Sequence, residues 1–118
     1  MRILMILFSA LSLSLFSMAP AISGEVTPRQ TSQYIGEQAT VVGTVAQVSR
    51  SRGGTTFINF GGRFPNHIFY AVIFKKNSGQ FSNIGRFEGK QVAITGTIEL
   101  YKGKPQIILV APSQIELR

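Results

Sequence analysis

Apolar and polar residues alternate along two segments that share the same phase. In residues 91–100, QVAITGTIEL, alternate positions are apolar on one face and mostly polar on the other, which is the period of a half-buried strand. Residues 36–45, GEQATVVGTV, repeat this phase. Each copy carries a glycine, Gly43 or Gly96, on its apolar face, and such glycines mark a bend, a bulge or a close approach by another segment. The pattern predicts two strongly curved strands with the same face inward.

The chain contains no third copy of this pattern. Solenoid arrays need about three or more repeats to bury a core. The two copies therefore indicate two similar strands of one sheet rather than a tandem array.

Other segments of the chain also have the composition of strands. Three predicted loops separate these strands. Residues 49–54, SRSRGG, predict an exposed loop, and residues 61–66, GGRFPN, are rich in turn residues. Residues 101–105, YKGKP, predict a tight hairpin. These breaks separate the remaining predicted strands, which are 55–60 (TTFINF), 67–75 (HIFYAVIFK) and 106–117 (QIILVAPSQIEL).

Two short helices complete the predicted elements. Thr27 followed by Pro28 fits a helix start, so we predict a lead-in helix over 29–35 that ends at Gly36. Phe81 and Ile84, three positions apart, indicate one or two helical turns between the third and fourth strands. The predicted fold class is all-β: a five-stranded Greek-key OB-fold barrel with a short N-terminal lead-in helix and a short helix between strands 3 and 4.

Three stretches also resemble a known group of domains. They are 34–48 (YIGEQATVVGTVAQV), 53–74 (GGTTFINFGGRFPNHIFYAVIF) and 87–109 (FEGKQVAITGTIELYKGKPQIIL). They resemble OB-fold nucleic-acid-binding domains of anticodon-binding and single-strand-binding proteins and, more narrowly, small exported bacterial proteins with one such domain. This resemblance implies a nucleic-acid-binding face on strands two and three, flanked by the strand 1–2 and strand 4–5 loops.

The N-terminus has the features of an export signal. Arg2 gives a positive start, residues 3–18 are apolar except for four serines, and small residues follow at 19–23. This apolar run is short for a membrane span of about 20 residues. We therefore predict a signal peptide over 1–21, cleaved after Ala21 or Ser23, a lead-in segment over 22–36 and an OB-fold domain over 37–118. The product is expected to be a periplasmic or secreted monomer with no stable membrane span after cleavage.

The amino-acid composition limits the kinds of site and partner expected for this protein. The chain has no cysteine, which excludes disulfides and thiolate metal sites. It has 12 lysines and arginines against 5 acidic residues, a formal net charge of +7. This basic excess favours an anionic partner, either nucleic acid or another polyanion.

Basic and aromatic residues gather in adjoining loops and strands of the predicted barrel. Lysine and arginine meet phosphates, and nucleobases stack on aromatic rings for about 1–3 kcal/mol each. Alternation places Ile58 and Phe60 inward, and Phe74 is also expected in the core. It does not settle which face of 67–75 is displayed, and His67 is expected at a strand edge. The predicted nucleic-acid-binding residues are Arg50, Arg52, Phe57, Asn59, Arg63, Phe64, Lys75, Tyr101, Lys102 and Lys104.

Nothing in the sequence predicts a catalytic site. The five glutamates are spread along the chain, aspartate is missing, and His67 has no evident carboxylate partner in the sequence. Metal-assisted hydrolysis needs clustered carboxylates. We expect no enzyme activity, metal or cofactor, and predict an exported module that binds single-stranded nucleic acid with little sequence preference. The alternative is an envelope module that binds a protein or an anionic cell-surface polymer.

Overall fold

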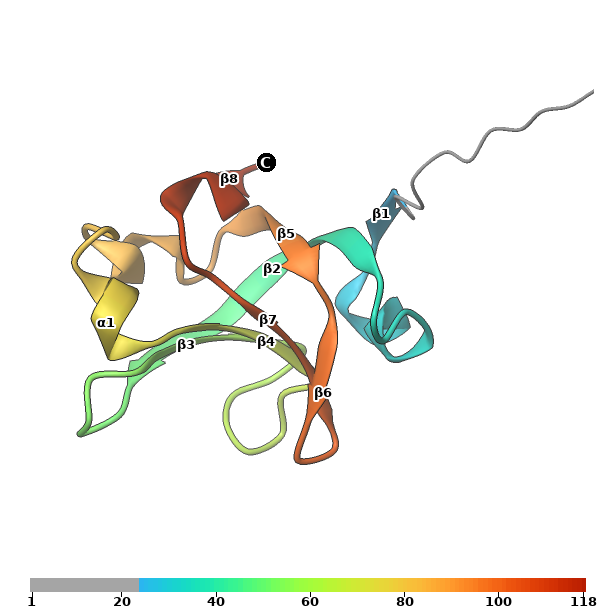
Figure 1. The fold of residues 1–118 in the computed structure, drawn as a ribbon, viewed down its shortest axis with the longest axis horizontal. Coiled ribbons are helices and arrows are strands. Elements are labelled where there is room, and N and C mark those ends of the chain that lie inside the picture. Colours follow the sequence, from blue (N-terminus) through green and yellow to red (C-terminus); the bar gives the residue numbers. More distant parts are fainter. Residues whose placement is uncertain (1–23) are drawn as a thin grey trace, which may run out of the picture.

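The computed structural model describes residues 24–118, so the predicted signal peptide and its cleavage sites lie outside the described residues. Within this part of the chain no helix is long and apolar enough to cross a membrane. The elements, shown in Figure 1, are β1 (Glu25–Val26), η1 (Pro28–Gln33), β2 (Gln38–Arg50), β3 (Thr56–Phe60), β4 (Phe69–Ile73), α1 (Lys75–Ser78), η2 (Ile84–Phe87), β5 (Gln91–Thr97), β6 (Glu99–Tyr101), β7 (Lys104–Ile108), η3 (Pro112–Gln114) and β8 (Ile115–Leu117).

The strands form one sheet in the order β6-β7-β4-β3-β2-β5-β8, with β1 beside β2. The β1–β2 and β4–β7 pairs are parallel and the other pairs are antiparallel. The structure confirms a mostly β, OB-like fold. The hydrogen-bonded ladder ends at β6 and β8, however, so the sheet is not closed into the predicted five-stranded barrel.

Two predicted strands are each divided into two. The fourth, 91–100, breaks into β5 and β6 at Ile98, whose backbone N–H donates to Glu37 O at 2.9 Å and whose carbonyl accepts from Gly36 N at 2.7 Å. The fifth, 106–117, breaks into β7 and β8 around η3. There the Gln114 side chain accepts from Val110 N at 2.7 Å and so caps the turn. At the first break the bonds join Ile98 to residues 36–37, just before β2, and at the second break a side chain of the same turn provides the bond.

The core lies on the inner face of the curved sheet. Ile58 and Phe60 are fully buried in it, as predicted. Phe74 is 40% exposed, which contradicts its predicted place in the core. Strand β4 ends at Ile73, and Phe74 occupies the N-cap position of α1, so the strand alternation no longer applies to it. The fully buried large side chains are Phe60, Phe69, Ile58, Ile73, Ile94, Ile98, Ile107, Leu109, Val41, Val45, Val72 and Val92.

The two glycines on the apolar faces mark close approaches by other segments. A Cβ atom on Gly43 would lie 2.7 Å from Cγ of Pro28, and one on Gly96 would lie 2.6 Å from Cγ2 of Ile107. Contacts this short leave no room for a side chain. The strands that carry these glycines, β2 and β5, are antiparallel neighbours.

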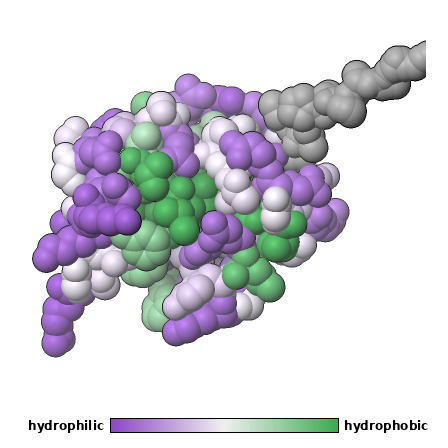
Figure 2. Space-filling view, viewed as in Figure 1, coloured by the Kyte–Doolittle hydropathy of each residue, from purple (hydrophilic) through white to green (hydrophobic). Residues whose placement is uncertain are grey.

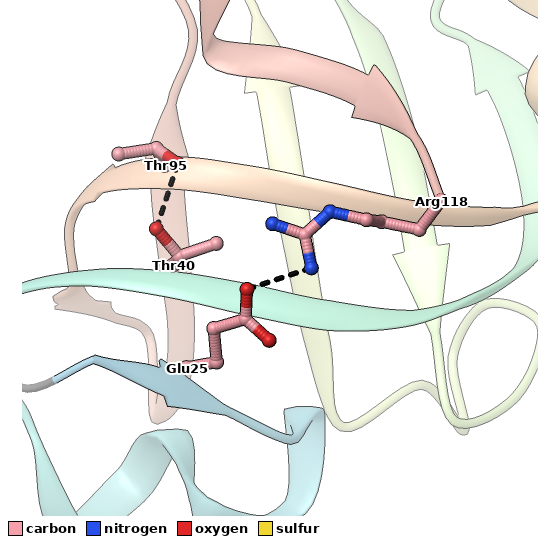
Figure 3. A network of polar contacts seen from close by, with 4 residues as sticks. All are labelled: Glu25, Thr40, Thr95 and Arg118. Carbon is pink, nitrogen blue, oxygen red and sulfur yellow. Dashed lines mark hydrogen bonds and ion pairs between the residues drawn. The ribbon is translucent and has the colours of Figure 1, made fainter.

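Two polar contacts in this region join β2 to β5 and β1 to the C-terminal residue, as Figure 3 shows. The hydroxyl groups of Thr40 on β2 and Thr95 on β5 lie 2.9 Å apart. Glu25 on β1 forms an ion pair of 2.7 Å with Arg118. Both chain ends of the described segment are thus fastened to the same region of the sheet.

The predicted helices occur as short turns. The lead-in helix is a 3₁₀ helix, η1, that begins after Thr27, whose hydroxyl accepts from Gln30 N at 3.3 Å while Gln30 Oε1 accepts from Thr27 N at 2.8 Å. This reciprocal cap satisfies two free N–H groups at the helix start. Between the third and fourth predicted strands the chain forms α1 and then η2, which begins at Ile84.

Candidate functional site

A groove of about 450 Å³ lies on the outer face of β2, β3 and β4. The β2–β3, β3–β4 and β6–β7 loops all project toward the lower side of Figure 1. In Figure 2 their tips are mostly hydrophilic, whereas hydrophobic residues gather over β7 and the segment that follows it. The groove is lined by Gln47, Ser49, Arg50, Ser51, Phe57, Asn59, Phe64, His67, Tyr70, Tyr101, Lys102 and Lys104.

A bulge in β2 determines which of its side chains reach the groove. The pairing of β2 with β3 is regular from Gln47 onward but shifts between Val45 and Gln47. Val45 is buried in the core before the shift, and Val48 packs against the core after it. An extra residue, here Ala46, reverses the alternation and re-aims the following side chains. Gln47 and Ser49 therefore line the groove, and strand β2 continues through Arg50, which had been predicted in a loop.

Polar residues follow one another across the outer face of the sheet. Gln47 lies opposite Asn59, Asn59 opposite Tyr70, and Tyr70 opposite Gln106. Asn59 was predicted on this outer face, and it lines the groove, but only 1% of it is exposed. Asn59 and Tyr70, which are buried and line the groove, thus form a polar part of its floor, with the half-buried Gln47 beside them.

Hydrogen bonds determine the orientation of the two amides in this row. The Oε1 atom of Gln47 accepts from the backbone N–H of Phe64 at 2.8 Å and from Nδ2 of Asn59 at 2.9 Å. A backbone N–H group can only donate, so the Gln47 atom beside it must be the oxygen. The Asn59 atom that faces Gln47 must then be its nitrogen, which leaves Oδ1 of Asn59 buried without a partner.

A continuous series of aromatic rings runs along the groove. The ring centroids of Phe64 and His67 are 5.8 Å apart, those of His67 and Tyr70 are 5.4 Å apart, and those of Tyr70 and Phe57 are 5.9 Å apart. Tyr101, on the opposing hairpin, is 52% exposed. Phe64, Tyr101 and the half-buried Phe57 offer flat apolar surfaces on which planar ligand groups can stack, whereas His67 and Tyr70 are buried.

Positive side chains surround these rings. Arg50 lies at the end of β2, and Nζ of Lys102 lies 5.4 Å from the ring centroid of Tyr101. Nζ of Lys104 donates to the carbonyls of His67 at 2.6 Å and Pro65 at 3.3 Å, so it fastens the hairpin to the β3–β4 loop. Within residues 24–118 none of these three cations forms an ion pair. Their charges are therefore available to an anionic ligand, although Lys104 is partly committed to structural bonds.

The titratable groups on the groove floor favour their neutral forms. Burial lowers the pKa of the His67 imidazole below its usual 6.5, and the positive charge of Lys104 lowers it further. Burial also raises the pKa of the Tyr70 phenol, with a smaller contribution from Tyr101. The groove thus combines a neutral floor with a positive rim.

The structure brings seven of the predicted site residues together in the groove lining: Arg50, Phe57, Asn59, Phe64, Tyr101, Lys102 and Lys104. The other three lie outside it. Arg52 and Arg63 are exposed in the β2–β3 and β3–β4 loops, and Lys75 begins α1, where its side chain lies against Gly54.

Sequence reasoning missed five of the lining residues, which are Gln47, Ser49, Ser51, His67 and Tyr70. His67 precedes β4, but it is 5% exposed and faces the groove rather than lying at an open strand edge. Tyr70 was missed because both faces of its strand are apolar. Its position opposite Asn59 in the register is the signal that identifies it.

The groove has no recognisable metal centre. Across residues 24–118, no three histidine, cysteine, aspartate or glutamate side chains gather closely enough to hold an ion. The side chains described above offer stacking, positive charge and hydrogen bonding to a ligand in the groove.

No protein-family model matches the sequence, and no curated protein matches it either. Solved structures are similar in fold. A protein of Leishmania major Friedlin classed as an aspartyl-tRNA synthetase has a TM-score of 0.55 and 8% identity, over 88% of this chain and 22% of that chain. OBody AM1L10, bound to hen egg-white lysozyme, has a TM-score of 0.56 and 17% identity, over 89% of this chain and 98% of that chain. At these identities the similarity establishes an OB-type fold alone.

Proposed function

We propose that this chain is a binding module that holds single-stranded nucleic acid in the groove on β2, β3 and β4. The observation that carries the proposal is the series of rings from Phe64 to Phe57, which lies in one groove with Arg50, Lys102 and Lys104. Unpaired bases can stack on such rings while their phosphates meet the cations. A duplex keeps its bases stacked on one another, so single strands suit this arrangement better.

Four groove residues have definite roles in this proposal. Phe57 and Tyr101 stack on bases from the two sides of the groove, and Arg50 and Lys102 contact phosphates at its rim. Stacking and phosphate contacts tolerate any sequence, because every base has a flat face. We further propose that the protein acts after export directed by residues 1–21, as a monomer, and that it binds its ligand without catalysing a reaction.

Binding of short labelled oligonucleotides, followed by fluorescence anisotropy at several salt concentrations, tests this function. If Arg50, Lys102 and Lys104 each neutralise one phosphate, log K falls against log salt with a slope of about −2, from about −0.7 per phosphate. Phe57→Ala and Tyr101→Ala should each weaken binding by about 1–3 kcal/mol. Binding of a heparin-like polyanion, which has no bases to stack, should remain unchanged in both variants. The absence of oligonucleotide binding at low salt would reject the proposal.

The alternative function is an envelope module that binds a protein or an anionic cell-surface polymer. One observation favours protein binding: the OBody of similar fold and extent is bound to lysozyme. The predicted export signal also favours a partner outside the cytoplasm. If the partner is an anionic polymer, oligonucleotides and the heparin-like polyanion would bind with the same affinity per charge, and Phe57→Ala and Tyr101→Ala would weaken neither more than the other.

A further inference from the structure

Two polar atoms in the groove lack partners although they are buried. Oδ1 of Asn59 and Nδ1 of His67 make no hydrogen bond in the described structure. Asn59 is 1% exposed and His67 is 5% exposed, and both line the groove. Buried polar atoms almost always have partners, and an exception requires an explanation. These two atoms are therefore candidates for contacts with a ligand that enters the groove.

The identity of the Asn59 atom indicates what such a ligand must supply. Because the backbone N–H of Phe64 fixes Oε1 of Gln47, and Oε1 of Gln47 fixes Nδ2 of Asn59, the atom left over is a carbonyl oxygen. A carbonyl oxygen only accepts hydrogen bonds. The floor therefore requires a donor from the ligand.

The direction of this oxygen follows from the order of the strands. Asn59 on β3 lies between Gln47 on β2 and Tyr70 on β4. Its nitrogen faces Gln47, so its oxygen faces the side of Tyr70, within the series of stacking rings. This oxygen is shielded from solvent in the ligand-free protein, so a base must displace a neighbouring side chain to reach it with its edge.

We propose that Oδ1 of Asn59 accepts a hydrogen bond from the exocyclic amino group of a stacked base, so that the groove prefers cytosine and adenine to uracil and thymine. This inference rests on the proposed function and adds selection among bases to it. Cytosine and adenine carry an amino group at the edge used in base pairing. Uracil and thymine carry a carbonyl there, and their one N–H group lies between two carbonyl oxygens that repel another acceptor.

His67 fits the same arrangement as a second contact. Burial and Lys104 lower its pKa, so the imidazole is neutral near pH 7 and one of its ring nitrogens is an acceptor. A neutral floor also avoids attracting a phosphate into the place of the base. The cations at the rim would thus bind the phosphate of a nucleotide, and the Asn59 amide on the floor would bind its base.

The test compares oligo-dC with oligo-dU of the same length, because cytosine and uracil share one ring shape but differ in the amino group. For the purified full-length chain we expect oligo-dC to bind about fivefold more tightly, which corresponds to about 1 kcal/mol, the lower end of the discrimination given by a specific base contact. Asn59→Leu should bring this ratio close to one while oligo-dU affinity stays within about threefold, because stacking and phosphate contacts remain.

A second variant and a control keep the test decisive if Asn59→Leu fails to fold. Gln47→Met removes the acceptor that orients Asn59, so it should also reduce the ratio. Thr44→Ala, an exposed position of β2 outside the groove lining, should leave the ratio unchanged. Circular dichroism of each variant establishes that it is folded.

The outcomes separate this inference from the proposed function. Equal affinity of the unaltered chain for both oligonucleotides would overturn base selection and leave single-strand binding intact. Tighter binding of oligo-dU, or an unchanged ratio in folded Asn59→Leu and Gln47→Met, would overturn the role of Asn59. Binding of neither oligonucleotide would overturn both proposals.

Discussion

Asn59 shows how far the environment of one residue can differ from what its sequence position indicates. Strand alternation assigns it to the outer face, where an amide is usually solvated, and the structure places it on that face but buries it. The difference arises because Gln47 and Tyr70 flank it and the loops rise around it. His67 is another polar residue enclosed by the same groove, and its chemistry changes in consequence.

At this scale the pH dependence of stability tests the burial of His67. The pKa of His67 lies below 6.5 in the folded protein and near 6.5 in the unfolded chain. In the pH range around these two pKa values the unfolded chain binds more protons, so the free energy of unfolding rises with pH. As pH falls from about 7.5 to 5, the unaltered protein should lose more stability than His67→Gln, which cannot titrate. Urea denaturation at both pH values measures the difference. An equal loss in the two proteins would show that His67 is not held neutral by the fold.

At the scale of elements, the sequence predicts what depends on local pattern. The shared phase of residues 36–45 and 91–100, their inward glycines and the hairpin turn at Lys102 and Gly103 were all predictable, and the structure confirms them. These features follow from alternation and turn chemistry within a few residues.

The features that the sequence could not predict depend on contacts between distant segments. The bulge at Ala46 appears only in the pairing of β2 with β3, and it decides that Gln47 enters the groove. The break at Ile98 depends on its bonds to residues 36–37. Both faces of β4 are buried, so alternation cannot tell that Tyr70 belongs to the groove.

Substitution of the two inward glycines tests the packing of the curved strands. A Cβ atom at Gly43 would meet the ring of Pro28, and one at Gly96 would meet Ile107. Overpacking of this kind typically costs about 1–3 kcal/mol, so Gly43→Ala and Gly96→Ala should each lower the free energy of unfolding by that amount. Gly79→Ala is the matched control, because a Cβ there meets nothing within 4 Å and the backbone has φ −66°.

Urea denaturation again provides the measurement. Gly79→Ala should change stability by no more than about 0.5 kcal/mol in either direction. Stabilities of Gly43→Ala and Gly96→Ala that match this control would mean that the neighbouring segments do not press against the strands as closely as described.

At the scale of the whole molecule, the fold and the ligand require separate arguments. The similarity to two OB-type structures at 8% and 17% identity establishes the arrangement of strands, and this fold serves many ligands. The case for single-stranded nucleic acid depends instead on where the positive charge and the rings lie. The groove holds three cations and its aromatic rings on one face, while the ion pair of Glu25 and Arg118 joins β1 to the C-terminus.

Backbone amide chemical shifts, recorded while a short single-stranded oligonucleotide is added to ¹⁵N-labelled protein, test this placement most directly. If the strand lies in the groove, the largest changes occur at Gln47, Asn59 and Tyr70, and the amides of Thr40 and Thr95 on β2 and β5 stay nearly unchanged. Changes that gather around Thr40 and Thr95, or no changes at any residue at low salt, would contradict binding of nucleic acid in this groove.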